Sequence, residues 1–170
     1  MGCWQEVVSM RISVSIDIDG NNITSFKPRI LVLEYNAVFG PTRKISVQYD
    51  GNFLRTEKHY SNLYFGASLA AITDLANKRG YSLVGTNSAS SNAFFLRNDL
   101  INNRVEVLSA EKAYVTSLFR ESRDREGNLT SLSGNVRLEI IRGLPVYRID
   151  VNRNRAAVGP LTSIVVTGYQ

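Results

Sequence analysis

Apolar and polar residues alternate near the start of the chain. Over residues 11–18 the apolar side chains fall at every second position and many are β-branched, a pattern typical of a strand with one buried face. The polar cluster at 19–22 then predicts a turn. A continuous apolar run at 30–33 predicts a strand that is buried on both faces. The chain is therefore expected to begin with two successive strands.

The clearest helical pattern in the chain covers residues 61–79. Ser61 is the expected N-cap, and Gly80 stands where a helix commonly ends. The apolar residues that would share one helical face are Phe65, Leu69, Ile72 and Ala76. Ile45 and Val47 predict a short strand that comes before this helix.

Two more strands are predicted at 81–85 and 93–97. The polar residues 86–92 between them are few enough for a hairpin, so the pair is expected to be antiparallel. The rest of the chain predicts a helix beginning at Ser109, a helical segment from Ser133 to Gly143, and strands at 146–151 and 161–167. Strands interspersed with helices indicate the α/β class.

The composition narrows the class of protein further. A chain of 170 residues with 44% hydrophobic content suits one globular domain. It contains neither a long apolar stretch nor a signal-peptide pattern at the start, so we expect no membrane association and a cytoplasmic location. Its single cysteine, Cys3, excludes an internal disulfide and a cysteine-rich metal site.

The net charge of +5 comes from arginines concentrated between residues 120 and 155. A basic surface of this kind can attract nucleic acid. In this segment, however, acidic residues such as Glu121, Asp124 and Glu139 stand between the arginines. A mixed, solvated surface is the favoured interpretation, and nucleic acid is not an expected partner.

Several short stretches carry a resemblance to a known family. Residues 15–21 read Ser-Ile-Asp-Ile-Asp-Gly-Asn and resemble the motif that closes the fourth strand of FkbM-like methyltransferases, class I enzymes that use S-adenosylmethionine (SAM). Residues 30–36 resemble their fifth strand, with its glutamate at the end. The segments 60–68 and 93–97 are similar to bacterial proteins allied to that group. The resemblance covers residues 11–100.

The resemblance implies a fold and a division of the chain. Class I methyltransferases end in an antiparallel hairpin strand that is inserted into an otherwise parallel sheet. We therefore expect a partial Rossmann-like sheet, mixed parallel with an antiparallel C-terminal hairpin. Residues 1–100 would form the methyltransferase-like core, and residues 101–170 would add a helical extension and a terminal strand packed on the same domain.

The chain departs from that family in two places. A glycine-rich turn holds the family's cofactor because the backbone must approach it closely, yet among twelve glycines here no two are two residues apart. Too few residues precede the first predicted strand to supply the family's first three strands. In addition, residues 21–27 are fewer than the dozen or more that a parallel crossover needs. We expect a shortened relative that an N-terminal partner or a homo-oligomer would complete.

Asp17 and Asp19 form the leading candidate site. Residues i and i+2 of a strand point to the same side, and ligands gather at the carboxyl ends of strands in open α/β sheets. The pair is therefore a candidate for catalysis and for holding a divalent metal ion; the alternative is that one caps the turn and the other is solvated. By resemblance, the candidate SAM-binding residues are Asp17, Gly20, Asn21 and Glu34.

Other candidate residues lie beyond the predicted strands. His59 is the single histidine, and a pKa near neutrality makes it a candidate catalytic proton acceptor; the alternative is an ordinary surface residue. Asn36, Tyr64, Asn87 and Asn92 are candidates for contacting the hydroxyls of a small-molecule or glycan substrate. Turn chemistry for the two later asparagines and a core position for Tyr64 are the competing explanations.

Three functional interpretations remain open. The first is a methyltransferase-like domain related to SAM-dependent O-methyltransferases of sugar or natural-product hydroxyls, incomplete as an autonomous enzyme. The second is a non-catalytic binding or structural domain, or a half-enzyme that needs a partner. The third rests on Asp-x-Asp-Gly, which resembles the first motif of haloacid-dehalogenase-like phosphatases; Asp17 would attack phosphorus and Asp19 would act as acid and base.

Overall fold

The structure, a computed structural model, describes residues 27–48, 50, 52–117, 121–150 and 155–161. Its strands are β1 (Ile30–Glu34), β2 (Ile45–Ser46), β3 (Tyr81–Thr86), β4 (Asn92–Arg97), β5 (Ser122–Arg123), β6 (Leu129–Thr130), β7 (Pro145–Asp150) and β8 (Arg155–Pro160). Its α-helices are α1 (Arg55–Lys58), α2 (Leu69–Lys78), α3 (Ala110–Ala113) and α4 (Val136–Ile140), and single 3₁₀ turns are η1 (Ala37–Phe39) and η2 (Asn98–Leu100).

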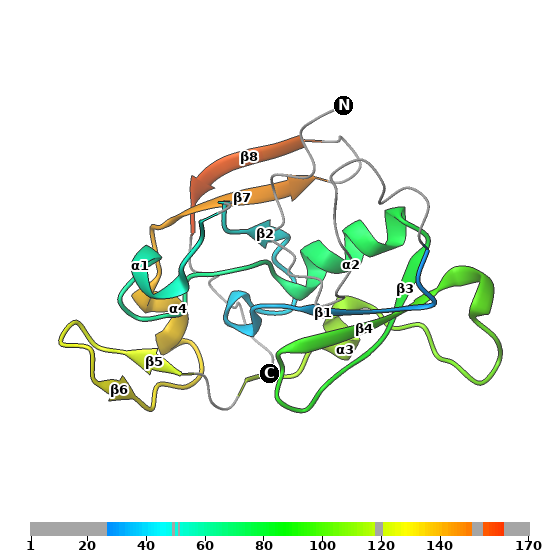
Figure 1. Ribbon diagram of the computed structural model, residues 1–170, viewed down its shortest axis with the longest axis horizontal. Helices are drawn as coiled ribbons and strands as arrows, with labels where there is room; N and C mark the ends of the chain where they lie inside the picture. Colours follow the sequence, from blue (N-terminus) through cyan, green and yellow to red (C-terminus); the bar gives the residue numbers. More distant parts are fainter. Residues whose placement is uncertain (1–26, 49, 51, 118–120, 151–154, 162–170) are drawn as a thin grey trace, which may run out of the picture.

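Two three-stranded sheets lie on either side of α2 (Figure 1). The first, sheet A, has the order β1-β4-β3, and the second, sheet B, has the order β2-β7-β8. A small β5–β6 hairpin lies apart from both. The late strands β7 and β8 join the early strand β2, so segments far apart in the chain form one sheet.

The predicted hairpin is confirmed as β3 and β4. Strand β4 occupies the centre of sheet A and pairs antiparallel with β3 on one side and with β1 on the other. It follows that β1 and β3 run in the same direction, with α2 in the connection between them. The α/β class is thus observed. All pairings between the described strands are antiparallel, and the predicted strand at 11–18 lies outside the described residues.

Strand β1 is buried on one face only, although its continuous apolar run predicts burial on both. Leu33 is 2% exposed and packs in the main core, whereas Ile30 and Val32 are 58% and 48% exposed. The physical reason is that successive strand residues point to opposite faces. Only the face of sheet A that carries Leu33 packs against α2.

Helix α2 begins at Leu69, later than the predicted start after Ser61. Its N-cap is Ser68, whose Oγ accepts a hydrogen bond from the Ala71 backbone N–H at 3.2 Å. The upstream residues stay non-helical because the Asn36 side chain binds the carbonyls of Leu63 and Phe65, at 2.9 and 3.0 Å. The end of the helix is as predicted.

Two apolar clusters form the core. The larger joins sheet A, α2 and part of α3, with Leu33, Ile72, Leu83 and Phe95 among its most buried members. The second packs sheet B against η1 and α4, and includes Phe39, Leu63, Ile141 and Val146. The described part of the chain therefore has two apolar cores, one at each three-stranded sheet.

The C-terminal region differs from expectation in detail. Ser109 does cap a helix, but α3 is a single turn that ends at Ala113. Helix α4 has Asn135 as its N-cap position, instead of the predicted Ser133. Strand β7 is confirmed, while β8 was not predicted and the expected strand at 161–167 lies almost wholly outside the described residues. Within the described part, no helix has the length and apolarity required to cross a membrane.

Candidate functional site

Three of the predicted site residues come together at one end of sheet A. Glu34 closes β1 and stands opposite Asn92 in the β1–β4 register. Asn87 follows the end of β3, and its backbone N–H donates to the Asn92 carbonyl at 3.0 Å. Since β1 and β3 run in the same direction, this is the edge formed by their carboxyl ends. In open parallel α/β sheets ligands bind at this edge, whereas the described pairings of sheet A are antiparallel.

The hairpin loop at this edge is held mainly by Asn87. Its Oδ1 accepts the backbone N–H groups of Ser91 and Asn92, each at 3.0 Å, and its Nδ2 donates to the Ser91 Oγ at 3.1 Å. These bonds satisfy the side chain within its own loop. Turn chemistry therefore accounts for Asn87, the alternative stated from the sequence.

Ser90, in the same loop, was not singled out by the sequence. It is 2% exposed, its φ of +51° lies in the left-handed region, and its Oγ has no hydrogen-bond partner in the described part of the molecule. A non-glycine residue in that region and an unsatisfied buried hydroxyl both cost free energy. No sequence pattern distinguishes this serine from its neighbours, so only the structure could reveal it.

Asn36 lies just beyond β1 but inside the protein. It is fully buried, and besides its two donated bonds its Oδ1 accepts the Val38 backbone N–H at 3.1 Å. The side chain thus fastens η1 to the segment 63–65. In this arrangement both amide hydrogens are used internally, which leaves no donor for a substrate hydroxyl.

Tyr64 lies in the segment that Asn36 holds. The ring is 7% exposed, and the hydroxyl donates to the backbone carbonyl of Pro145 at the start of β7. Burial raises the pKa of the Tyr64 hydroxyl. The residue joins the core to sheet B, in agreement with the core position considered from the sequence.

His59 is half-buried and is bonded to Ser61. The His59 Nδ1 lies 2.7 Å from the Ser61 Oγ, and the Ser61 backbone N–H also approaches Nδ1 at 3.4 Å. Either neutral tautomer can make the His59–Ser61 bond, with Nδ1 as its donor or as its acceptor. Because Ser61 is fully buried, this pair stabilises a turn and does not present a nucleophile.

The surroundings of His59 are aromatic and cationic. The ring centroids of His59 and Tyr60 are 4.4 Å apart, and the Arg125 Cζ lies 5.2 Å from the Tyr60 centroid. Burial, and secondarily the positive charge of Arg125, lower the pKa of His59 below its ordinary value of 6.5. The side chain is therefore neutral at pH 7.

We expect an NMR titration of the single histidine to give a pKa below 6.5. Arg125→Gln should move this pKa upward, whereas Arg104→Gln, a change of the same charge in another loop, should leave it in place. The pKa of His59 is lower in the folded chain than in the unfolded chain, so the unfolded chain takes up the proton first as the pH falls. The contribution of the neutral His59 to stability is therefore complete above pH 6.5 and is lost as the pH falls through the folded pKa. An unchanged titration in Arg125→Gln would contradict this account.

The remaining predicted site residues lie outside the described part of the chain. They are Asp17, Asp19, Gly20 and Asn21. Among the described residues, no group of three or more His, Cys, Asp or Glu side chains could hold a metal ion. The metal and phosphatase interpretations therefore stay predictions of the sequence.

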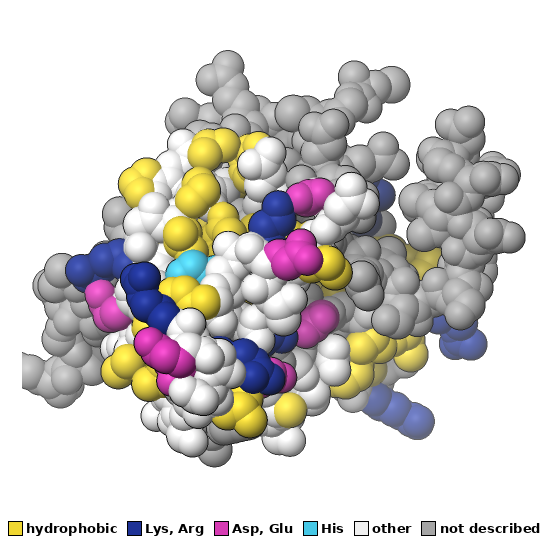
Figure 2. All heavy atoms as spheres, turned by 60° about the vertical axis from the view of Figure 1, so that its left-hand side comes forward, with side chains coloured by type: hydrophobic (Ala, Val, Ile, Leu, Met, Phe, Trp, Pro, Cys, Tyr) yellow, Lys and Arg dark blue, Asp and Glu magenta, His cyan; other side chains and the backbone are white. Residues whose placement is uncertain are grey.

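The surface agrees with the mixed charge pattern of the sequence. In the space-filling view of Figure 2, Lys and Arg side chains are interspersed with Asp and Glu. Exposed ion pairs account for part of this mixture, including Lys58 with Asp50 and Arg142 with Glu139. Exposed pairs of this kind contribute little to stability.

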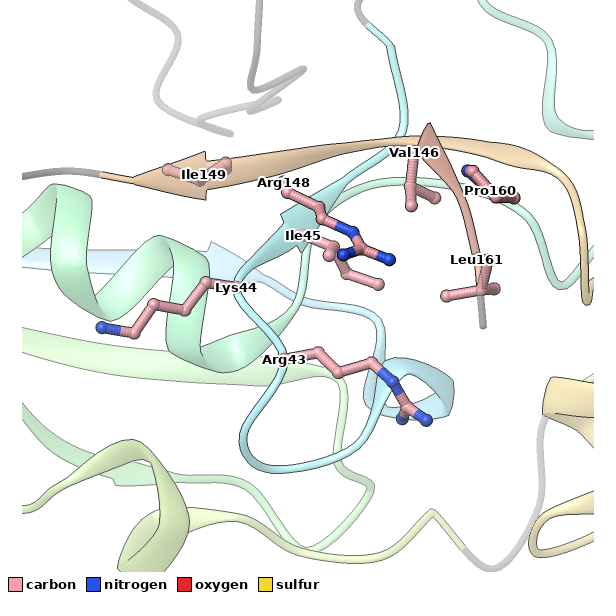
Figure 3. Close-up of a pocket in the computed structure, with 8 residues that line it drawn as sticks. All are labelled: Arg43, Lys44, Ile45, Val146, Arg148, Ile149, Pro160 and Leu161. Atoms are coloured by element: carbon pink, nitrogen blue, oxygen red, sulfur yellow. The ribbon is translucent and has the colours of Figure 1, made fainter. Parts of the chain in front are cut away.

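A pocket of about 320 Å³ lies at the other sheet, where sequence reasoning placed no site (Figure 3). The residues that line it are Arg43, Lys44, Ile45, Val146, Arg148, Ile149, Pro160 and Leu161. The pairing of β2 with β7 brings the two basic segments together. No local pattern could show this pairing.

Comparisons with known proteins give no relative. The chain matches no model of a protein family, and neither a curated protein nor a solved structure matches it significantly. No function is therefore transferred to the chain from a relative.

Proposed function

We propose that the chain is a methyltransferase-like domain, related to SAM-dependent O-methyltransferases and incomplete as an autonomous enzyme. The observation that supports this most is the position of β4. This strand lies between β1 and β3 and is antiparallel to both, while β1 and β3 run in the same direction. An antiparallel strand inserted between neighbours that run in the same direction is the arrangement that the resemblance to class I methyltransferases implies.

In this proposal sheet A has further strands beside β1, outside the described part of the chain. β1 is an edge strand in the order β1-β4-β3, so one side of it is open to pairing among the described strands. A Rossmann-like sheet would continue there with parallel strands, supplied by the N-terminal residues or by a separate partner chain. An exposed strand edge is a template for such pairing.

The carboxyl edge of sheet A is the proposed ligand site. Glu34 is exposed there, and its carboxylate could accept hydrogen bonds that the hydroxyl groups of a ribose donate. The Ser90 hydroxyl, buried and unsatisfied in the neighbouring loop, suits a ligand that brings a polar atom. SAM bound at this edge would supply the methyl group, and in the proposal Asp17, Asp19, Gly20 and Asn21 would complete the site.

His59 is proposed to take the hydroxyl proton from the substrate at Nε2, in the tautomer whose Nδ1–H donates to the Ser61 Oγ. The lowered pKa keeps the ring neutral at pH 7, as a proton acceptor must be. The core positions of Asn36 and Tyr64 favour a structural role for both. Substrate contacts in the proposal are therefore limited to Asn92 and the exposed part of the hairpin loop.

The test is a titration of the full chain with S-adenosylhomocysteine, the stable compound that remains when SAM has donated its methyl group. Binding is measured by ¹⁵N chemical-shift changes. We expect weak binding, with a Kd of about 1 mM, because the glycine-rich loop is missing. The shift changes should centre on Glu34, Ser90 and Asn92. Glu34→Gln and Ser90→Gly should each weaken binding by at least about threefold; glycine tolerates the backbone conformation of residue 90.

Glu57→Gln is the matched control. Glu57 lies on α1, is exposed, and carries the same charge as Glu34. Absence of shift changes at about 5 mM ligand, which corresponds to an interaction too weak to be specific, would overturn the proposal. Equal weakening by Glu34→Gln and Glu57→Gln would do the same. Either result would favour the non-catalytic binding or structural domain.

A further inference from the structure

The pocket at sheet B combines a basic rim with an apolar lining. Arg43, Lys44 and Arg148 are the charged residues among its described lining, which includes no acidic residue. The residues that form the remaining wall are Ile45, Val146, Ile149, Pro160 and Leu161. A volume of about 320 Å³ falls within the range of small-molecule sites.

The three cations are not equivalent. The Lys44 Nζ is 2.6 Å from the Asp74 carboxylate on α2, so its charge is already compensated. Figure 3 shows Lys44 directed away from the two arginines, whose guanidinium groups extend toward the same side of the pocket. Arg43 and Arg148 are therefore the two cations that line the pocket together.

Arg148 is the exposed member of the pair. It stands opposite Ile45 in the β2–β7 register, and within the described part of the chain no carboxylate forms an ion pair with it. Its guanidinium presents several N–H donors in a planar fork, which matches the oxygens of a phosphate or carboxylate.

Arg43 is held in position by the protein. Its Nη1 donates to the Phe39 carbonyl at 2.9 Å, which fixes the side chain beside η1. Burial is the main cause of the lowered pKa of Arg43, and a half-buried cation gains from an anion nearby. A guanidinium fixed in this way loses little conformational entropy when it binds a ligand.

The apolar lining sets the second requirement for a ligand. Ile45, Val146, Ile149 and Leu161 are each at most 7% exposed and belong to the core clusters. They form a rigid wall instead of a mobile surface. An organic anion has apolar atoms to place against the part of this wall that lines the pocket, whereas an inorganic ion has none.

We propose that the pocket between β2, β7 and the end of β8 binds a small organic phosphate ester. Its phosphate group lies at Arg43 and Arg148, and its apolar body lies against Val146 and Leu161. A dianionic phosphate is favoured over a carboxylate because it has charge for both guanidinium groups. This site is built on sheet B, so it stands independently of the cofactor site proposed at the carboxyl edge of sheet A.

The experiment is a calorimetric titration of the full chain with phenyl phosphate at low ionic strength. We expect a Kd below about 1 mM, with phenylacetate and inorganic phosphate each at least about fivefold weaker, since each lacks one half of the interaction. Arg148→Met keeps the aliphatic stem and removes the charge, so it should weaken phenyl phosphate binding at least about tenfold. ¹⁵N shift changes should map to Ile45, Val146 and Leu161.

Arg104→Met is the matched control, because it removes the same charge from an exposed loop after η2. It should change the Kd by less than about twofold. The proposal is overturned if phenyl phosphate does not bind at about 5 mM. It is equally overturned if Arg104→Met and Arg148→Met weaken binding to the same extent, because that would show attraction by net charge alone. Unchanged spectra of the unligated variants establish that both remain folded.

Discussion

Phe95→Ala is expected to lower the free energy of unfolding by about 3–5 kcal/mol, whereas Phe94→Ala, one residue earlier, lowers it by about 1 kcal/mol or less. Phe95 is fully buried and lies opposite Leu31 and Leu83 in the centre of sheet A. Phe94 points to the other face and is 36% exposed. The same residue type is thus removed from the same strand, and only burial differs.

Urea unfolding of the two variants, followed by circular dichroism, measures this difference. The cavity left by Phe95 cannot be filled because Ala93 and Ile72 around it belong to the same packed cluster. If both variants lost equal stability, the exposed face of sheet A would have to be covered in solution. That result would contradict the burial pattern described above.

Asn36→Ala is expected to cost about 3 kcal/mol, because three hydrogen bonds are lost in a fully buried environment. The carbonyls of Leu63 and Phe65 would then lose a donor without access to bulk water. The segment before α2 would lose the bonds that keep it non-helical. This is an unusually large effect for the removal of one polar side chain.

The matched control for this second variant is Asn102→Ala. Asn102 also accepts a backbone N–H through Oδ1, from Arg104 at 3.0 Å, but it is exposed. Its removal should cost about 0.5 kcal/mol or less because water replaces the lost bond. Comparable losses for Asn36→Ala and Asn102→Ala would show that burial does not determine the cost, and would invalidate the structural role assigned to Asn36.

The start of α2 shows how tertiary contacts can override a local pattern. Periodicity alone extends the helix back to Phe65, and Ser61 has a suitable cap side chain. In the folded protein the carbonyls of Leu63 and Phe65 bind Asn36, which lies 27 and 29 positions away. A helix through these residues would require those carbonyls for its own bonds, so a distant side chain determines where the helix begins.

The candidate sites also depend partly on local sequence patterns and partly on tertiary contacts. Glu34, Asn87 and Asn92 were selected from turns and strand ends, and they meet at one edge because β1, β3 and β4 join in one sheet. The arginines of the sheet B pocket, by contrast, come from two segments about a hundred positions apart that pair only in the folded state. The pattern of apolar and polar residues in one sequence does not predict that β2 pairs with β7.

The sequence by itself determined the local elements of this protein: the alternating and apolar runs that became β1, β3, β4 and β7, the glycine that ends α2, and the mixed surface charge. These depend on the side-chain period of strands and helices and on the φ preference of glycine. Only the tertiary structure decided the strand order of sheet A, the late start of α2, the strain at Ser90 and the basic pocket at sheet B. Each of these depends on contacts between residues far apart in the chain, whose free energies are gained only when the whole domain folds.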